Sequence, residues 1–160
     1  KLITEASHIV IVARDYAEKY TGTTNLEEAC RIIHERGACI AGVTDGANGS
    51  YFVWPDGTFY RCEPFTQSTV VDTTGAGDSF HGAFLANLVH TINHMRGQDT
   101  TSTTKNDCAS MHAVELLKAC AHSDLEKASI FASAVASLNT QGIGGRSPLP
   151  TLQSVQELIG

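Results

Sequence analysis

Residues 70–85, Val-Val-Asp-Thr-Thr-Gly-Ala-Gly-Asp-Ser-Phe-His-Gly-Ala-Phe-Leu, constrain the fold more than any other stretch. A short β-rich run is followed by a turn of small residues and then by an apolar segment. Apolar side chains in that segment recur every four positions, as they do on one face of a helix: Phe80, Phe84, Leu88 and Ile92. The stretch therefore predicts a strand, a turn and a helix, with Ala83 and Leu85 on the apolar side of the helix.

The turn Gly75-Ala76-Gly77 lies where the predicted strand meets the predicted helix. Small residues let a ligand approach the backbone, and the first amides of a helix have no partner within it. These amides and the helix dipole predict an anion site that suits a phosphate. Asp78 would repel a phosphate, but it fits a base that deprotonates an attacking hydroxyl while the amides of Gly75, Ala76, Gly77 and Asp78 hold the phosphoryl charge. On these residues alone, a helix cap at Asp78 and a simple glycine turn stay open.

Strands and helices alternate along the rest of the chain, which predicts an α/β fold. The run Ile-Val-Ile-Val at residues 9–12 is typical of a strand buried on both faces of a parallel sheet. Gly22 and Gly37 end the two helices that follow. The predicted order is a strand at 9–12, helices at 13–20 and 25–36, a strand at 38–43, and a hairpin with strands at 50–54 and 58–62.

Capping patterns set the starts of the other predicted helices. Thr24 and Glu27 form a capping box before the helix at 25–36, and Ser123 and Glu126 form a second box. Thr151 caps the last helix. The predicted helices after the phosphate motif span 111–121, 125–138 and 152–159. Four apolar residues of the last one are expected in the core: Leu152, Val155, Leu158 and Ile159.

Composition narrows the classes of function. A net charge of −6 argues against nucleic acid, whose binding needs clustered Lys and Arg. No apolar run reaches about 20 residues, so no membrane span is predicted. The five cysteines form no CxxC pair or Cys/His cluster, which indicates reduced thiols in a cytoplasmic protein and no zinc site. Because a domain seldom starts on a buried strand, we expect the C-terminal part of a longer protein.

The run Asp-Thr-Thr-Gly-Ala-Gly-Asp, followed by Phe80 and a helix rich in small residues, resembles the C-terminal motif of the ribokinase (PfkB) family of carbohydrate kinases. The resemblance implies a three-layer, doubly wound (Rossmann-like) α/β sheet of the ribokinase-like fold. Residues 1–160 would form its C-terminal, nucleotide-binding part. It implies ATP-dependent phosphoryl transfer to a small sugar, with Asp78 as general base and the Gly75–Asp78 amides as anion hole. The family's N-terminal sugar-binding part and lid are absent, and a homodimer through that lid is compatible with the resemblance.

The loop Thr44-x-Gly46-x-x-Gly49 is weak by itself, because Asp-Gly and Asn-Gly pairs are generic turns. In the family, a Thr-x-Gly-x-x-Gly loop at this place lines the nucleotide. The resemblance therefore implies a nucleotide loop made of Thr44, Asp45, Gly46, Ala47, Asn48 and Gly49. Ser133 lies where relatives place a nucleotide-contacting residue, and tight helix packing explains it equally well.

The resemblance also implies cations beside ATP. Relatives activated by K⁺ would use the equivalents of Asp72, Thr74, Asn139, Gly142, Gly144 and Ser147, whose oxygens suit a hard cation. Many relatives carry Asn-x-x-Glu after the first strand, which helps to organise Mg²⁺. This chain has Ala13 and Tyr16 there, as in the ketohexokinase-like branch, so Mg²⁺ would be held mostly by the nucleotide and water.

Some features fit the family less closely. Residues 95–110 are polar and aperiodic, which predicts a flexible insert, and decoration is favoured over regulation. His90, His94 and His112 around it are expected in water, without a metal. For His81, helix packing is favoured over a substrate contact. A non-catalytic nucleotide-binding relative and a nucleoside kinase of the same fold stay open as alternatives.

Overall fold

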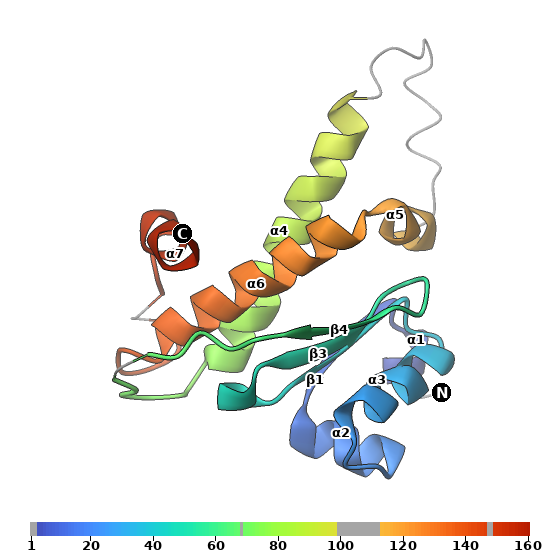
Figure 1. Ribbon diagram of the computed structural model, residues 1–160, viewed down its shortest axis with the longest axis horizontal. Helices are drawn as coiled ribbons and strands as arrows, with labels where there is room; N and C mark the ends of the chain where they lie inside the picture. Colours follow the sequence, from blue (N-terminus) through green and yellow to red (C-terminus); the bar gives the residue numbers. More distant parts are fainter. Residues whose placement is uncertain (1–2, 68, 99–112, 147–148) are drawn as a thin grey trace.

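Four strands form one mixed sheet in the computed structural model, which describes residues 3–67, 69–98, 113–146 and 149–160 (Figure 1). The strands follow the chain in space: β1 (Ile9–Ala13), β2 (Ile40–Thr44), β3 (Ser50–Val53) and β4 (Phe59–Cys62). β1 and β2 are parallel with Ile9 opposite Ile40, and the other two pairs are antiparallel. The parallel pair needs a crossover, which helices supply here. The predicted α/β order is confirmed.

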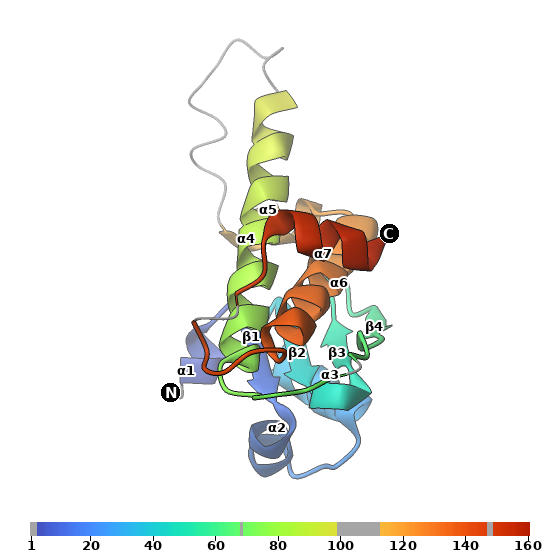
Figure 2. The same cartoon turned by 90° about the vertical axis from the view of Figure 1, so that its left-hand side faces the viewer.

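The helices lie in two layers, one on each face of the sheet (Figures 1 and 2). One face carries α2 (Arg14–Thr21) and α3 (Leu26–Glu35), and the other carries α4 (Ala76–Gln98) and α6 (His122–Asn139). Each layer buries its own apolar cluster against the sheet, so the predicted three-layer architecture is confirmed. The short elements are α1 (Ile3–Ala6), the 3₁₀ turn η1 (Gly46–Asn48), α5 (Ala113–Ala119) and α7 (Leu152–Ile159), which packs on α6.

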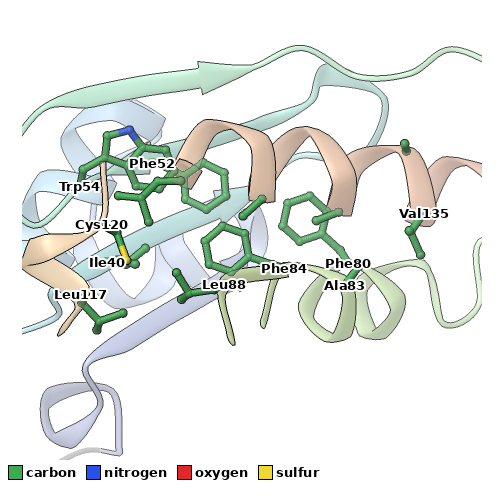
Figure 3. Packing of buried hydrophobic residues seen from close by; sticks show 14 of the residues in the cluster. Ile40, Phe52, Trp54, Phe80, Ala83, Phe84, Leu88, Leu117, Cys120 and Val135 are labelled. Carbon is green, nitrogen blue, oxygen red and sulfur yellow. The ribbon is translucent and has the colours of Figure 1, made fainter. Parts of the chain in front are cut away.

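Stacked aromatic rings hold the first half of α4 on the sheet (Figure 3). The Phe52 ring of β3 lies 4.8 Å from the Trp54 ring and 5.6 Å from the Phe84 ring, centroid to centroid. Phe80 stacks on Phe52 at 6.4 Å. Burying a phenylalanine side chain contributes about 1.5–3 kcal/mol. Phe80 and Phe84 thus fix the helix whose first turn carries Asp78.

The strand predicted at the start of the phosphate motif is absent, and that part of the prediction is wrong. Val70 and Val71 are 60% and 51% exposed, and the segment has no strand partner. The Val71 and Asp72 amides donate instead to the Thr140 carbonyl, after α6, at 2.8 and 3.2 Å. β-Branched side chains favour a strand only where a sheet edge is available, and this segment runs along a helix end. Ala76 and Gly77 belong to the first turn of α4.

Two predicted capping boxes do not form. The cap of α3 is Asn25, whose side chain accepts from the Glu28 amide at 3.1 Å, in place of Thr24. α6 begins at His122, so Ser123 lies inside its first turn and the cap residue, Ala121, makes no side-chain cap bond. The cap at Thr151 is confirmed, since it accepts from the Ser154 amide at 3.2 Å.

Some predicted core positions also differ. Leu85, Leu152 and Ile159 are 44%, 62% and 40% exposed, because each lies beyond the stripe that packs on the neighbouring helix. Val155 is buried as predicted.

The region of the predicted insert is described only in part. α4 continues to Gln98, so residues 95–98 are helical and not loop, whereas residues 99–110 and His112 lie outside the described residues. His90 and His94 are exposed, as predicted. Within the described part of the chain, no three His, Cys, Asp or Glu side chains gather as a metal site, and no helix is long and apolar enough to cross a bilayer.

Candidate functional site

A cavity of about 520 Å³ opens between the end of β2, the start of α4 and the face of α6. The loop after β2 contributes Thr44, Gly46, Ala47 and Gly49, and the first turn of α4 contributes Ala76, Gly77 and Phe80. Three elements that are distant in sequence therefore meet at one space. The α6 side and the segment after β4 complete the wall with Ser133, Ala136, Ser137, Pro64, Phe65 and Gln67.

The first turn of α4 presents free amide donors. The amides of Gly77 and Asp78 donate to no carbonyl among the residues that the structure describes, and Gly77 lines the cavity. The Ala76 amide differs from the prediction, because it donates to the Thr73 carbonyl at 3.2 Å. Asp78 is exposed beside the cavity and does not line it. The geometry suits an anion at the helix start, held by the amides of Gly75, Gly77 and Asp78.

The loop between β2 and β3 is a tight 3₁₀ turn closed by its own backbone. The Asp45 amide donates to the Gly49 carbonyl at 2.8 Å, and the Gly49 amide to the Gly46 carbonyl at 3.1 Å. Gly49 has φ +91°, and a Cβ there would lie 2.3 Å from the Cys62 carbonyl oxygen. Only glycine lets this loop lie against the end of β4. The glycines predicted from the sequence thus shape this wall of the cavity.

Asp45 and Asn48 belong to the predicted nucleotide loop but do not line the cavity. The Asp45 carboxylate accepts from the Arg14 guanidinium at 3.0 Å and from the Asn48 amide group at 3.1 Å. Arg14 also pairs with Glu18 at 2.7 Å. Hydrogen bonds from Arg14 to Glu18, and then to Asp45, raise the pKa of the guanidinium. This ion pair links the start of α2 to the loop, and no pattern in the sequence predicts it.

Arg14 stands within the segment that departs from the family's Asn-x-x-Glu. Ala13 lines the cavity but offers no side-chain oxygen, and the Tyr16 hydroxyl lies 3.1 Å from the Thr4 hydroxyl, away from the cavity. Neither position supplies a carboxylate to a divalent cation. That Mg²⁺ is held mostly by the nucleotide and water stays a prediction.

Two serines of α6 hold the segment that follows β4. The Ser137 hydroxyl donates to the Phe65 carbonyl at 2.8 Å, and the Ser133 hydroxyl reaches the Glu63 carbonyl at 3.5 Å. Ser133 is 9% exposed and also lines the cavity, so packing and ligand contact both remain open for it. Phe65 and Ser137 were not predicted as site residues. For Ser137, the only signal in the sequence is the high content of Ala and Ser in residues 128–137.

Hydrogen bonds join four of the residues predicted for K⁺: Asp72, Thr74, Asn139 and Gly144. The Asp72 carboxylate accepts from the Thr74 amide and the Gly144 amide, each at 2.9 Å, and these bonds, the Thr74 amide first, hold the pKa of Asp72 below its usual range. Asn139 is fully buried and donates to the Thr74 carbonyl at 3.4 Å. Its amide oxygen has no hydrogen-bond partner in the described part of the chain. A buried amide oxygen without a partner is a possible ligand for a hard cation such as K⁺.

Two glycines bring this turn against the start of α4. A Cβ on Gly75 would lie 2.4 Å from the Gly145 Cα, and Gly75 has φ +79°. Gly142 lies in the same turn, half-buried, and Ser147 lies outside the described residues. The cation residues and the anion site therefore share a backbone contact.

Comparison with known proteins supports the assignment of the fold and family. The 5-dehydro-2-deoxygluconokinase of Bacillus subtilis (strain 168) is 33% identical over 116 residues, which are 71% of this chain and 33% of that protein. The cytidine kinase of Thermococcus kodakarensis is 38% identical over 68 residues, 41% of this chain and 24% of that protein. The chain thus spans at most about a third of the length of these curated relatives.

Solved structures share the fold across nearly the whole chain. A fructokinase from Vibrio cholerae O395, with fructose, ADP and calcium bound, superposes with a TM-score of 0.72 at 20% identity, over 99% of this chain and 42% of its own. The ribokinase of Arabidopsis thaliana, complexed with ribose and ATP, gives 0.68 at 23% identity, over 98% and 42%. The family description "pfkB family carbohydrate kinase" matches residues 1–152, and the chain therefore belongs to that family.

Proposed function

We propose that the full-length protein containing this chain transfers the γ-phosphoryl group of ATP to a hydroxyl of a small sugar. The observation that carries the proposal is the shared cavity: the free amide of Gly77 and the loop at Gly46 and Gly49 open onto the same 520 Å³. That volume lies in the range of cofactor pockets. The fructokinase and ribokinase with similar folds bind ADP or ATP together with a sugar.

In the proposed reaction, Asp78 accepts the proton of the sugar hydroxyl while the hydroxyl oxygen attacks the γ-phosphorus of ATP. The bond from that phosphorus to the bridging oxygen breaks, and ADP leaves. The amides of Gly75, Gly77 and Asp78 hold the charge on the transferring group. Phosphoryl transfer depends mainly on positioning and charge stabilisation, so this small set of groups is adequate. The exposure of Asp78 leaves it open to a sugar held by the part of the protein outside this chain.

We propose separate binding sites for K⁺ and for Mg²⁺. Asn139, with its unpaired buried oxygen, and the Thr74 carbonyl would hold K⁺, which would stabilise the turn against the start of α4. Mg²⁺ bound to ATP would neutralise phosphate charge, with few ligands from this chain. We expect turnover to rise when K⁺ replaces Li⁺ and the response to be lost in Asn139→Leu.

The test is ADP release by the full-length protein over a panel of ketohexoses, pentoses and nucleosides. Asp78→Asn should lower kcat by about 10²–10⁴-fold while ADP affinity by calorimetry stays unchanged, because general-base catalysis contributes about that factor. Asp15→Asn, an exposed acid on α2, is the matched control and should behave as wild type. Turnover by Asp78→Asn at the wild-type rate would disprove the role of Asp78.

The same panel separates the two alternatives. The similarity to a cytidine kinase favours including nucleosides as acceptors. Turnover with nucleosides only would identify a nucleoside kinase. ADP binding without turnover on any acceptor would identify a non-catalytic nucleotide-binding protein.

A further inference from the structure

The His81 ring bridges the first turns of α4 and the strand β1, which lie side by side in Figure 2. Its Nδ1 lies 2.7 Å from the Gly77 carbonyl oxygen, and its Nε2 lies 2.9 Å from the Ile11 carbonyl oxygen. Ile11 is 70 residues away in the sequence. These contacts agree with the packing role favoured from the sequence, and they also place the ring between two walls of the candidate site.

The chemistry of the two contacts is restrictive. A carbonyl oxygen only accepts hydrogen bonds, and a neutral imidazole has one N–H. The contact with Ile11, which lies in another element, is therefore a hydrogen bond only when Nε2 carries a proton.

We propose that His81 is a positioning residue, which sets the first turn of α4 against β1 through its bond to Ile11. On one side, the ring holds the carbonyl of Gly77, whose amide is part of the anion site. On the other, β1 leads into Arg14, which holds the nucleotide loop through Asp45. The bond between His81 and Ile11 thus links the start of α4, which carries the anion site, to the strand that leads to Arg14 and the nucleotide loop.

Two substitutions separate the two bonds of the ring. A glutamine amide reaches about as far as Nε2, so His81→Gln retains a donor for Ile11. An asparagine amide reaches about as far as Nδ1, so His81→Asn retains only the bond to Gly77 in the same helix. His90→Asn, on the exposed face of α4, is the control. The kcat, the KM for ATP and the melting temperature are measured on the full-length protein.

We expect His81→Asn to lower kcat by about 10–100-fold with a KM for ATP within about 3-fold of wild type, since a displacement near 1 Å costs about 10²-fold in rate. His81→Gln should recover most of this loss, and His90→Asn should lose nothing. Equal kcat values for His81→Asn and His81→Gln, whether both normal or both low, would overturn the proposal.

A second measurement does not depend on turnover. In wild-type protein labelled with ¹⁵N-histidine, Nε2 of His81 should carry a proton, and the His81 signal is assigned as the one missing in His81→Gln. An unprotonated Nε2 would overturn the proposal without any kinetic data. The kinetic arm rests on the proposed phosphoryl transfer. If the wild type has no turnover, the proposed function fails while the NMR result still decides the contact.

Discussion

Replacing Gly75 by alanine should separate the start of α4 from the turn after α6. The new Cβ would lie 2.4 Å from the Gly145 Cα. Gly145 Cα is a backbone atom, so no side-chain rotation can relieve the overlap. Carbon atoms pack at about 3.5–4.0 Å, so one segment must move by about 1 Å or more. The left-handed conformation of Gly75 adds about 1–2 kcal/mol of strain. A displacement near 1 Å at catalytic groups can lower the rate about 10²-fold.

Gly22→Ala is the matched control for this experiment. Gly22, at the end of α2 and away from the cavity, has φ +82°, close to that of Gly75, but a Cβ there meets no atom within 4 Å. The two variants therefore carry the same backbone strain, and only Gly75→Ala carries the overlap. We expect similar losses of melting temperature from the strain and an additional loss for Gly75→Ala, and we expect kcat to fall about 10²-fold in Gly75→Ala alone.

The assay is ADP release by the full-length protein at saturating ATP, with melting temperatures measured in the same buffer. A kcat for Gly75→Ala within about 3-fold of that for Gly22→Ala would contradict this prediction, because the overlap would then have been absorbed without moving the amides. A crystal structure of Gly75→Ala would locate the displacement directly.

Three further predictions test other contacts. Arg14→Ala removes the partner of Asp45 and should raise the KM for ATP about 3–10-fold. The kcat and the melting temperature should stay nearly unchanged, because exposed ion pairs contribute at most about 1 kcal/mol. As a control, Arg31→Ala breaks a surface ion pair on α3 and should leave the KM for ATP unaltered. Because the pKa of Asp72 is lowered in the fold, the ionised carboxylate stabilises the protein above about pH 4, the usual range of a free aspartate, and this contribution is lost as the pH falls through the lowered pKa. The difference in melting temperature between wild type and Asp72→Asn should therefore be present at pH 7 and should shrink as the pH falls below about 4. Burial raises the pKa of the Cys30 thiol to about 12, so iodoacetamide at pH 8 should label the Cys30 peptide, read by mass spectrometry, only after denaturation.

Local patterns predicted most of the fold. The apolar run before Arg14 became β1, Gly22 ended α2 in a left-handed conformation, and Pro55-Asp56-Gly57 separated two antiparallel strands. These features depend on neighbours in the sequence, so the sequence alone contains them. The strand predicted at Val70 and Val71 failed for the opposite reason, since a strand needs an edge to pair with, and the sequence does not show where the edges are.

The candidate site divides in the same way. The loop at Gly46 and the turn at Gly77 were predicted, and both line the cavity. The long-range hydrogen bonds that position these segments were not predicted. Arg14 contacts Asp45, 31 residues away in the sequence, and His81 contacts Ile11, 70 residues away. Neither Arg14 nor His81 belongs to a local sequence pattern that sets it apart from other polar residues of its helix. Each contacts a partner that is distant in the sequence and comes near only in the folded chain.

Glycine loops can be predicted from the sequence and long-range side-chain hydrogen bonds cannot, because the two kinds of contact place different demands on the residue type. A loop that must lie against another backbone needs glycine wherever a Cβ would collide, as Gly49 does against the Cys62 carbonyl and Gly75 does against Gly145. That requirement is met by one residue type, so it leaves a mark in the sequence before the partner is known. A side-chain hydrogen bond or ion pair can be made by several residue types at several positions, so no single residue type in the sequence identifies it. Motif residues in this chain therefore define where a ligand would lie, and the residues that adjust the geometry around it have to be found in the structure.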